Sequence, residues 1–350
     1  MKRAAVCLLL ILLLLSAGCA GVSSGSGPKP PDPPDDGGGG ITNPPPSDTV
    51  FTPAGVDPGG MAFDAGTGRL VFAVSHQDRV FLIDTAALQV VKSVEARGGP
   101  IRAGFDAVTQ MYWVAMMDSG RVARFDRDLE PVDELSIGGM PRGIAIDSSR
   151  RRAYVVDFDR NQLIVIDLDS SNVLERIRTD YGPRFAAVDP ASGRVLVGCT
   201  TGGSLLLFEP DGTIIDRLSG FVAPTSGTAF PAAEGFLITD YGWGEVFLIS
   251  AVDCSIVERR ETAYGAAGVA LVPGGAACLV GNGIDTMLSL VEIPFTGPMS
   301  SLRAEVAAQG FVALPGTDHC LAADYRTGSL NVMRTTNFDW IANLISGRNR

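Results

Sequence analysis

Arginine and aromatic residues at recurring places of the sequence are the side chains best suited to chemistry. Arg142 and Arg184 both follow a proline and stand 42 residues apart. A guanidinium group binds carboxylate or phosphate through paired hydrogen bonds, so the two could hold one anionic group unless they pair with Asp157 or Asp180. Aromatic residues and arginine also dominate protein interfaces. The further candidate binding residues are Phe158, Arg160, Tyr241, Trp243 and Tyr325.

A stretch of four short apolar runs accounts for this recurrence. Residues 141–182 contain GIAID, RAYVVD, QLIVID and VLERIR, which are rich in β-branched residues and are separated by turn-forming Asp, Ser, Asn and Arg. Each run is predicted to be a β-strand. A four-stranded sheet of this kind has two apolar faces, so copies of it must stack against one another.

Two series of residues predict seven copies of this unit. A short anchor ends each third strand and an apolar residue marks each first strand, at intervals of 41 or 42 residues. The third-strand series is Asp84, Asp126, Asp167, Glu209, Ser250, Glu292 and Arg334. The first-strand series is Phe63, Phe105, Ile146, Val188, Phe230, Leu271 and Ala313. This period is typical of propeller blades. We therefore predict an all-β fold, a seven-bladed β-propeller of four-stranded blades, with a β-sandwich as the alternative.

The repeat also resembles a known family. The segments PRGIAID, AYVVD and NQLIVID resemble repeats of the YVTN (YncE-like) family of bacterial seven-bladed propellers, with some likeness to NHL repeats. The resemblance is strongest in residues 141–182 and 59–94, and the last four repeats lack the expected aspartate after the third strand. The resemblance implies the fold alone, because propellers support many unrelated activities.

The N-terminus predicts export and attachment to a membrane. Residues 1–18 have a basic start, an apolar run and small residues, as a signal peptide does. The segment LSAGC resembles a bacterial lipobox, which implies cleavage before Cys19 and lipid on its sulfur; a plain signal peptide is the alternative. By resemblance to enteric lipoproteins, Ala20 indicates the outer membrane. We expect a lipid-anchored protein of the bacterial cell envelope, on the periplasmic side or at the surface.

The composition of the remaining chain predicts a linker and one domain. Residues 19–48 are rich in Pro, Gly and Ser and are expected to be disordered. Residues 49–350 are predicted to form the propeller. Within them, residues 49–54 are expected to pair with the last blade and close the ring. Residues 340–345 also look like the fourth strand of that blade, so the sequence leaves two candidates for the strand that closes the ring.

Charge and the titratable residues argue against several site classes. The net charge of −11 disfavours nucleic acid as a partner, and the dense run Arg150–Arg152 is interpreted as a solvated turn. His76 and His319 fall in loops expected on opposite rims, so they should not share a metal. Asp157, Asp240 and Asp324 end second strands of alternate blades, about 20 Å apart. Each is expected to cap its own loop.

The cysteines and the absence of cofactor motifs also argue against a metal or cofactor site. We expect buried thiols, with a bridge between Cys254 and Cys278 as the alternative, at Cys199, Cys254, Cys278 and Cys320. The sequence contains no Cys-x-x-Cys-His haem attachment motif. We therefore predict no cofactor, no metal site and no catalytic residue.

These observations favour a membrane-anchored binding or scaffold module over an enzyme. Its partner would be a protein or a small anionic ligand on the rim that carries Trp243. The alternative is a lactonase-like or quinone-dependent propeller enzyme with its site at the channel mouth. Lactonase-like chemistry needs Glu, Asn and Asp around a metal, whereas the first strands offer Ala, Gly and apolar residues. A purely structural envelope protein is a third possibility.

Overall fold

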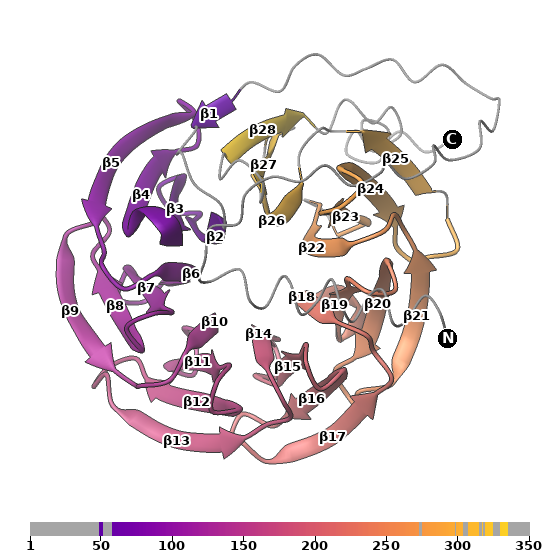
Figure 1. Cartoon of the computed structure of the whole chain (residues 1–350), viewed down its shortest axis with the longest axis horizontal. Helices are drawn as coiled ribbons and strands as arrows, with labels where there is room; N and C mark the ends of the chain where they lie inside the picture. The colour runs from indigo at the N-terminus through magenta and orange to yellow at the C-terminus, as the bar shows by residue number, and fades with distance from the viewer. Residues whose placement is uncertain are drawn as a thin grey trace, which may run out of the picture. The chain divides into compact units, whose positions relative to one another are not determined.

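Seven antiparallel sheets of four strands each form the described part of the chain. The computed structural model describes residues 49–51, 58–272, 275–297, 299–303, 307–314, 317, 319–324 and 330–334. The sheets are arranged as blades around a common centre (Figure 1), which confirms the predicted fold class. The predicted signal peptide, Cys19, the linker, Tyr325 and residues 340–345 lie outside the described residues.

The blades, numbered in chain order, have the same strand order from the centre outward. Blades 1 to 3 contain β2 (Pro58–Asp64), β3 (Arg69–Val74), β4 (Arg79–Asp84), β5 (Gln89–Glu95), β6 (Pro100–Asp106), β7 (Met111–Met116), β8 (Arg121–Phe125), β9 (Pro131–Ser136), β10 (Pro141–Asp147), β11 (Arg152–Asp157), β12 (Gln162–Asp167) and β13 (Val173–Arg178). Blades 4 and 5 contain β14 (Pro183–Val188), β15 (Val195–Cys199), β16 (Ser204–Phe208), β17 (Ile214–Ser219), β18 (Pro224–Phe230), β19 (Gly235–Asp240), β20 (Glu245–Ser250) and β21 (Ile256–Glu261).

The last two blades follow the same plan. They contain β22 (Ala266–Leu271), β23 (Ala277–Asn282), β24 (Met287–Glu292), β25 (Met299–Arg303), β26 (Ala308–Ala313), β27 (His319–Asp324), β28 (Leu330–Arg334) and β1 (Thr49–Phe51). Two 3-10 turns are present, η1 (Ser75–Gln77) and η2 (Pro231–Ala233). No helix in the described residues is long and apolar enough to cross a membrane.

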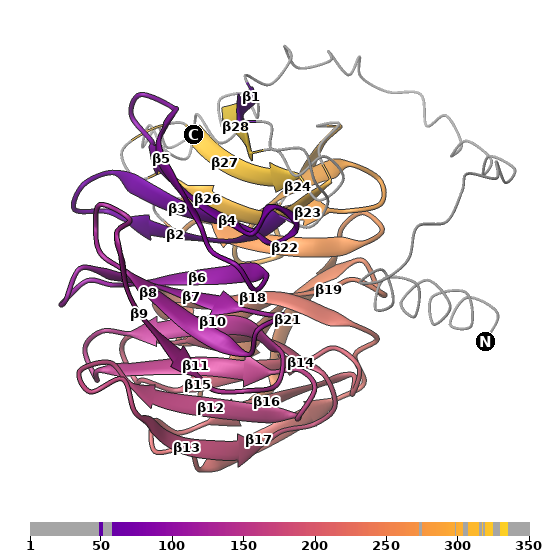
Figure 2. The same ribbon diagram turned by 60° about the vertical axis from the view of Figure 1, so that its left-hand side comes forward.

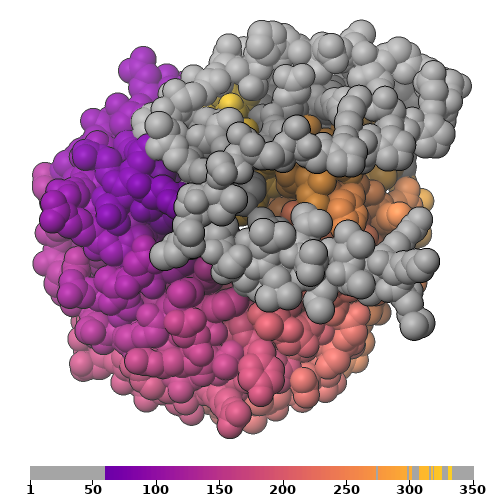
Figure 3. Space-filling view, in the orientation of Figure 1, coloured from indigo at the N-terminus to yellow at the C-terminus, as the bar shows by residue number. Residues whose placement is uncertain are grey.

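The hydrophobic core lies between blades rather than within them. Seven clusters of buried residues are present, and each joins side chains of two neighbouring blades. One cluster, for example, packs Trp113 of blade 2 against Val155 and Ile164 of blade 3. The first strands of successive blades follow one another in chain order (Figure 2), and neighbouring blades are in close contact (Figure 3). Burial of apolar surface therefore requires the whole set of blades.

The first strand of the domain completes the last blade. β1 pairs with β28, with Thr49 opposite Asn331 and Phe51 opposite Leu330, and the sheet order is β1-β28-β27-β26. The predicted pairing of residues 49–54 with the last blade is thus confirmed for residues 49–51. This pairing covers the otherwise exposed edge of β28.

Contacts between loops confirm the predicted sharing of rims. The Asp157 carboxylate, at the end of β11, accepts a hydrogen bond of 3.0 Å from the Met140 N–H in the link before β10. The Asp240 carboxylate likewise accepts a hydrogen bond of 2.8 Å from the Val222 N–H in the link before β18. Loops between second and third strands therefore share one rim with the links between blades. We call this the link rim.

The other rim, which we call the turn rim, corrects the interpretation of Arg150–Arg152. The Arg151 side chain is only 18% exposed and donates two hydrogen bonds, of 2.7 and 2.8 Å, to the buried Asp106 of blade 2. Arg150 donates to backbone carbonyls of blade 4, and Arg152 pairs with Asp167. The run does begin in a turn, as predicted, but its side chains are partly buried rather than solvated. Arg151 connects blades 3 and 2, because its oppositely charged partner Asp106 lies across the blade boundary.

Candidate functional site

In blades 2 to 7, a β-bulge at the start of the first strand leaves one residue unpaired with the second strand. The pairing of β10 with β11 shifts between Pro141 and Gly143, and that of β14 with β15 shifts between Pro183 and Phe185. The extra residues at these two shifts are Arg142 and Arg184. A bulge leaves its extra residue unpaired and redirects the side chain. The corresponding residues of blades 2, 5, 6 and 7 are Ile101, Thr225, Ala267 and Gln309.

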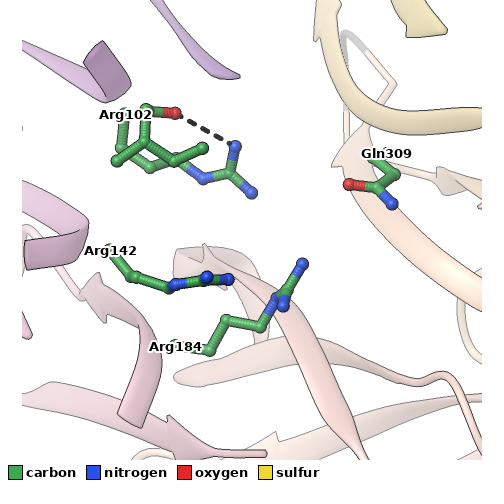
Figure 4. A pocket seen from close by; sticks show the side chains of 5 residues that line it. Arg102, Arg142, Arg184 and Gln309 are labelled. Carbon is green, nitrogen blue, oxygen red and sulfur yellow. Dashed lines mark hydrogen bonds between the residues drawn. The ribbon is translucent and has the colours of Figure 1, made fainter. Parts of the chain in front are cut away.

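Four of these bulge residues and Arg102 surround a small open hollow, with about 260 Å³ of empty space when open solvent is included. The lining residues are Ile101, Arg102, Arg142, Arg184 and Gln309. Figure 4 shows the three guanidinium groups and the Gln309 amide facing the same space. The arginines come from three consecutive blades, and Gln309 comes from blade 7. Among the described residues, the lining therefore combines three cations with one amide and contains no carboxylate.

The side chain of Arg142 is held in place by an aromatic ring. Its guanidinium carbon lies 5.0 Å from the centre of the Phe158 ring, a cation–π contact. The Nε atom is buried without a hydrogen-bond partner. Among the described residues Arg142 forms no ion pair. Its positive charge is thus held in position, and no carboxylate of the described part of the chain neutralises it.

The two aspartates considered as partners of these arginines are engaged elsewhere. Asp180 forms an ion pair of 2.6 Å with Arg217 and accepts a hydrogen bond from the Ser204 hydroxyl. Asp157 accepts hydrogen bonds from the backbone N–H groups of Met140 and Arg160. Among the described residues neither aspartate pairs with Arg142, whose guanidinium group lines the hollow.

A glycine allows the arginine-bearing strands to approach closely. A Cβ atom built on Gly143 would lie 2.8 Å from the carbonyl oxygen of Arg184 and 2.9 Å from the Cα of Phe185. Both of these atoms belong to the backbone of β14, so they cannot move aside unless the strand itself shifts. Gly143 therefore lets β10 and β14 come together at the point where Arg142 and Arg184 line the hollow.

The structure brings some of the predicted site residues together and separates others. Phe158 contacts Arg142 through its ring. Arg160 instead donates a hydrogen bond of 3.4 Å to the Ile137 carbonyl and does not line the hollow. Trp243 is 55% exposed on the link rim, and Tyr241 lies beside Gly283 of blade 6. Neither of these two aromatic residues lines the hollow.

Sequence reasoning missed three lining residues, Ile101, Arg102 and Gln309. Arg102 stands one residue later than Arg142 and Arg184 relative to the preceding proline, so it does not share their register. Gln309 follows Ala308 rather than proline. The first-strand series of 41 or 42 residues contained the signal for Gln309, because it places that residue at the same register as Arg142.

Metal chemistry finds little support in the donor groups of the described residues. His76 lies in η1 after β3, whereas His319 begins β27, so they stand at opposite ends of their blades. Asp240 accepts hydrogen bonds from the N–H groups of Gly242 and Trp243 in its own loop. Its predicted capping role is confirmed, as is that of Asp157. No group of three or more His, Cys, Asp or Glu residues that could hold a metal ion occurs among the described residues.

The four cysteines of the propeller are buried and carry free thiols. Burial raises the pKa of the thiols of Cys199, Cys254, Cys278 and Cys320 to about 12. Such thiols stay protonated at neutral pH and are poor nucleophiles. The prediction of buried apolar thiols is confirmed.

Comparison with known proteins supports the fold and goes no further. No protein-family model matches the chain, and no curated protein matches it. Among solved structures, the chain is similar to one of Kuenenia stuttgartiensis hydrazine synthase, with 16% identity, a TM-score of 0.71, and coverage of 83% of this chain and 97% of that chain. The likeness shows a β-propeller. Since 1677 chains of solved structures match, the fold is too widespread to indicate a function.

Proposed function

We propose that this chain is a binding module that takes an anionic group at the mouth of its central channel. The observation that carries the proposal is the convergence of Arg102, Arg142 and Arg184 on one hollow, whose lining by the described residues includes no carboxylate. Arginines that serve stability alone, such as Arg151, contact acidic residues of the protein. Arg142 contacts an aromatic ring instead.

The geometry suits an anion of more than one negative charge. Arginine presents several N–H donors in a fixed plane, which matches the oxygens of carboxylate and phosphate groups. Donors from three blades can contact different oxygens of the same ligand, and the Gln309 amide can contact a neutral part. A hydrogen bond to a charged group contributes about 1.5 to 3 kcal/mol. Loss of one arginine should therefore weaken binding by about tenfold or more.

The N-terminal sequence supports a place in the bacterial cell envelope for this module. We propose that lipid on Cys19 anchors the chain in a membrane, as the lipobox-like segment LSAGC indicates. The Pro- and Gly-rich residues 19–48 would then act as a tether of roughly 30 Å. The resemblance of residues 141–182 to YVTN repeats fits this proposal, since that family consists of bacterial propellers.

Calorimetric titration with citrate and with inorganic phosphate tests the proposal. We expect the wild-type chain to bind at least one of the two at a single site, and the Arg142→Gln, Arg184→Gln double variant to lose that binding. The matched control is Arg69→Gln with Arg121→Gln, which removes the same charge at exposed ion pairs with Asp128 and Glu134. Equal binding by both double variants, or none by wild type, would contradict the proposal.

A further inference from the structure

The link rim also carries an exposed group of aromatic and apolar side chains. Tyr181 is 67% exposed, Trp243 55%, Tyr264 40% and Ile284 37%. We call these four residues the aromatic arc. All three exposed aromatic side chains of the described residues belong to it. The turn rim, by contrast, exposes single aliphatic residues such as Val108 and Val252.

Close backbone contacts show that three members of the arc are neighbours. A Cβ on Gly244, next to Trp243, would lie 3.3 Å from the Cα of Tyr264. A Cβ on Gly265, next to Tyr264, would lie 3.0 Å from the Cγ1 of Ile284. Loops of blades 5 and 6 therefore place these side chains on one continuous surface. Exposed apolar surface of this kind marks interaction sites more often than isolated exposed residues do.

Two members of the aromatic arc stand close in sequence to bulge residues at the start of first strands. Tyr181 stands three residues before Arg184, and Tyr264 stands three residues before Ala267, the bulge residue of blade 6. Both tyrosines thus occupy links that lead directly into the channel mouth. The cations come from blades 2 to 4 and the arc comes from blades 4 to 6, so blade 4 supplies both Tyr181 and Arg184.

We infer that the link rim is a docking surface for an acidic polypeptide segment with apolar side chains beside its acidic residue. One carboxylate of the segment enters the hollow and contacts the arginines, while its apolar side chains pack on Trp243 and Tyr264. This inference rests on the proposed function and names the ligand class for the same site. Arginine and aromatic side chains are the residue types that contribute most of the binding energy at protein interfaces.

Charge at the loop tips favours a polypeptide over an anionic membrane surface. Asp118, Asp159 and Asp285 are exposed in loops between second and third strands, on the same rim as the arginines. A flat anionic bilayer would meet these carboxylates before it reached the hollow. A single extended segment can pass between them, because it presents its charge at one point. The net charge of −11 also opposes general attraction to anionic lipid.

Selection from random peptides displayed on phage tests this inference with the full chain. We expect enrichment of peptides that combine Asp or Glu with aromatic or aliphatic residues. The Trp243→Ala, Tyr264→Ala variant should bind such a peptide about tenfold more weakly or worse, yet bind citrate as wild type does. The Val108→Ser, Val252→Ser control, on the turn rim, should bind both ligands normally. Replacing the acidic residues of the peptide by Asn or Gln should abolish its binding.

The possible results separate this inference from the proposed function. Citrate binding without any enriched acidic peptide, or a peptide that binds the Trp243→Ala, Tyr264→Ala variant normally, would overturn the inference and leave the anion site intact. Failure of the wild-type chain to bind either citrate or phosphate would instead overturn the proposed function. Vesicles of phosphatidylglycerol provide the remaining arm: if they bind through Trp243 and Tyr264 while acidic peptides do not, the partner is a membrane and the inference is wrong.

Discussion

Arg142 shows how one residue can be prepared for an external ligand. The bulge in β10 turns it toward the hollow, the Phe158 ring supports its guanidinium group, and no carboxylate of the described residues neutralises it. Such preorganisation lowers the entropy that a ligand must remove on binding. The same residue type at position 151 has the opposite surroundings, since Asp106 already satisfies its charge.

Phe158→Leu should weaken anion binding without unfolding the protein. Leucine keeps apolar contact but removes the π face that holds Arg142. A cation–π contact is worth about 0.5 to 1 kcal/mol, so we expect citrate affinity to fall by about two- to fivefold. Calorimetric titration measures this change, and the thermal midpoint checks the fold. Unchanged affinity would mean that Phe158 does not position the guanidinium group.

Arg151→Ala should destabilise the propeller far more than a substitution at an exposed ion pair. It leaves Asp106 as an uncompensated charge with no exposed surface, which costs about 3 kcal/mol or more. The matched control, Arg121→Ala, breaks a half-exposed pair with Glu134, where about 1 kcal/mol or less is expected. Urea unfolding of both variants measures the difference. Equal effects would show that Arg151 does not connect blades 2 and 3.

At the scale of elements, the sequence predicted the strands well because their signal is local. The runs RAYVVD and QLIVID coincide with β11 and β12, and the series of anchors fixed the number of blades. Contacts between turns of different blades could not be predicted in this way. Nothing in the run Arg150–Arg152 shows that Asp106, 45 residues earlier, faces it across a blade boundary. Arg102 was missed for a different reason, because it stands one residue after the bulge position of its blade.

Removing β1 should open the ring and promote aggregation. A chain that begins at Thr52 lacks the strand that pairs with β28, so it exposes unpaired backbone groups at a sheet edge. We expect a lower thermal midpoint and oligomers in size-exclusion chromatography. A chain that begins at Thr49 is the matched control and should stay monodisperse. If both chains behave alike, closure by β1 contributes little to the ring.

At the scale of the molecule, the two rims differ in chemistry. The turn rim of blades 1 to 4 carries four buried aspartates at the ends of first strands or just after them, Asp64, Asp106, Asp147 and Asp189. Blades 5 to 7 have Pro231, Val272 and Leu314 at this register. The link rim carries the arginine-lined hollow and the aromatic arc. One rim thus connects blades, and the other is the rim on which we propose that binding takes place.

The aspartates of the turn rim predict loss of stability in acid. Burial alone would raise the pKa of Asp106, but hydrogen bonds from Thr109 and Arg151 outweigh it and hold that pKa below the ordinary 3.8. The pKa values of Asp64 and Asp189 are lowered in the same way, by Thr67 with Arg127 and by Ser192. Such a carboxyl binds protons more weakly when folded. Its stabilisation is complete above 3.8 and is lost as the pH falls through the lower folded value.

Midpoints of urea unfolding measured between about pH 5 and pH 3 test whether stability falls in acid as predicted. We expect a steep fall for wild type and a shallower fall for Asp106→Asn, which has one titrating group fewer. The variant should also be less stable than wild type at neutral pH, since it loses the ion pair with Arg151. Parallel curves for the two proteins would exclude Asp106 as a source of acid sensitivity.

Crystals soaked in selenate test the central claim most directly, because selenium scatters X-rays anomalously and selenate is a tetrahedral dianion. The account predicts an anomalous peak between the guanidinium groups of Arg142 and Arg184, and no such peak in the Arg142→Gln, Arg184→Gln variant. An empty hollow in crystals where selenate occupies exposed arginines such as Arg97 would contradict the claim that the channel mouth is an anion site.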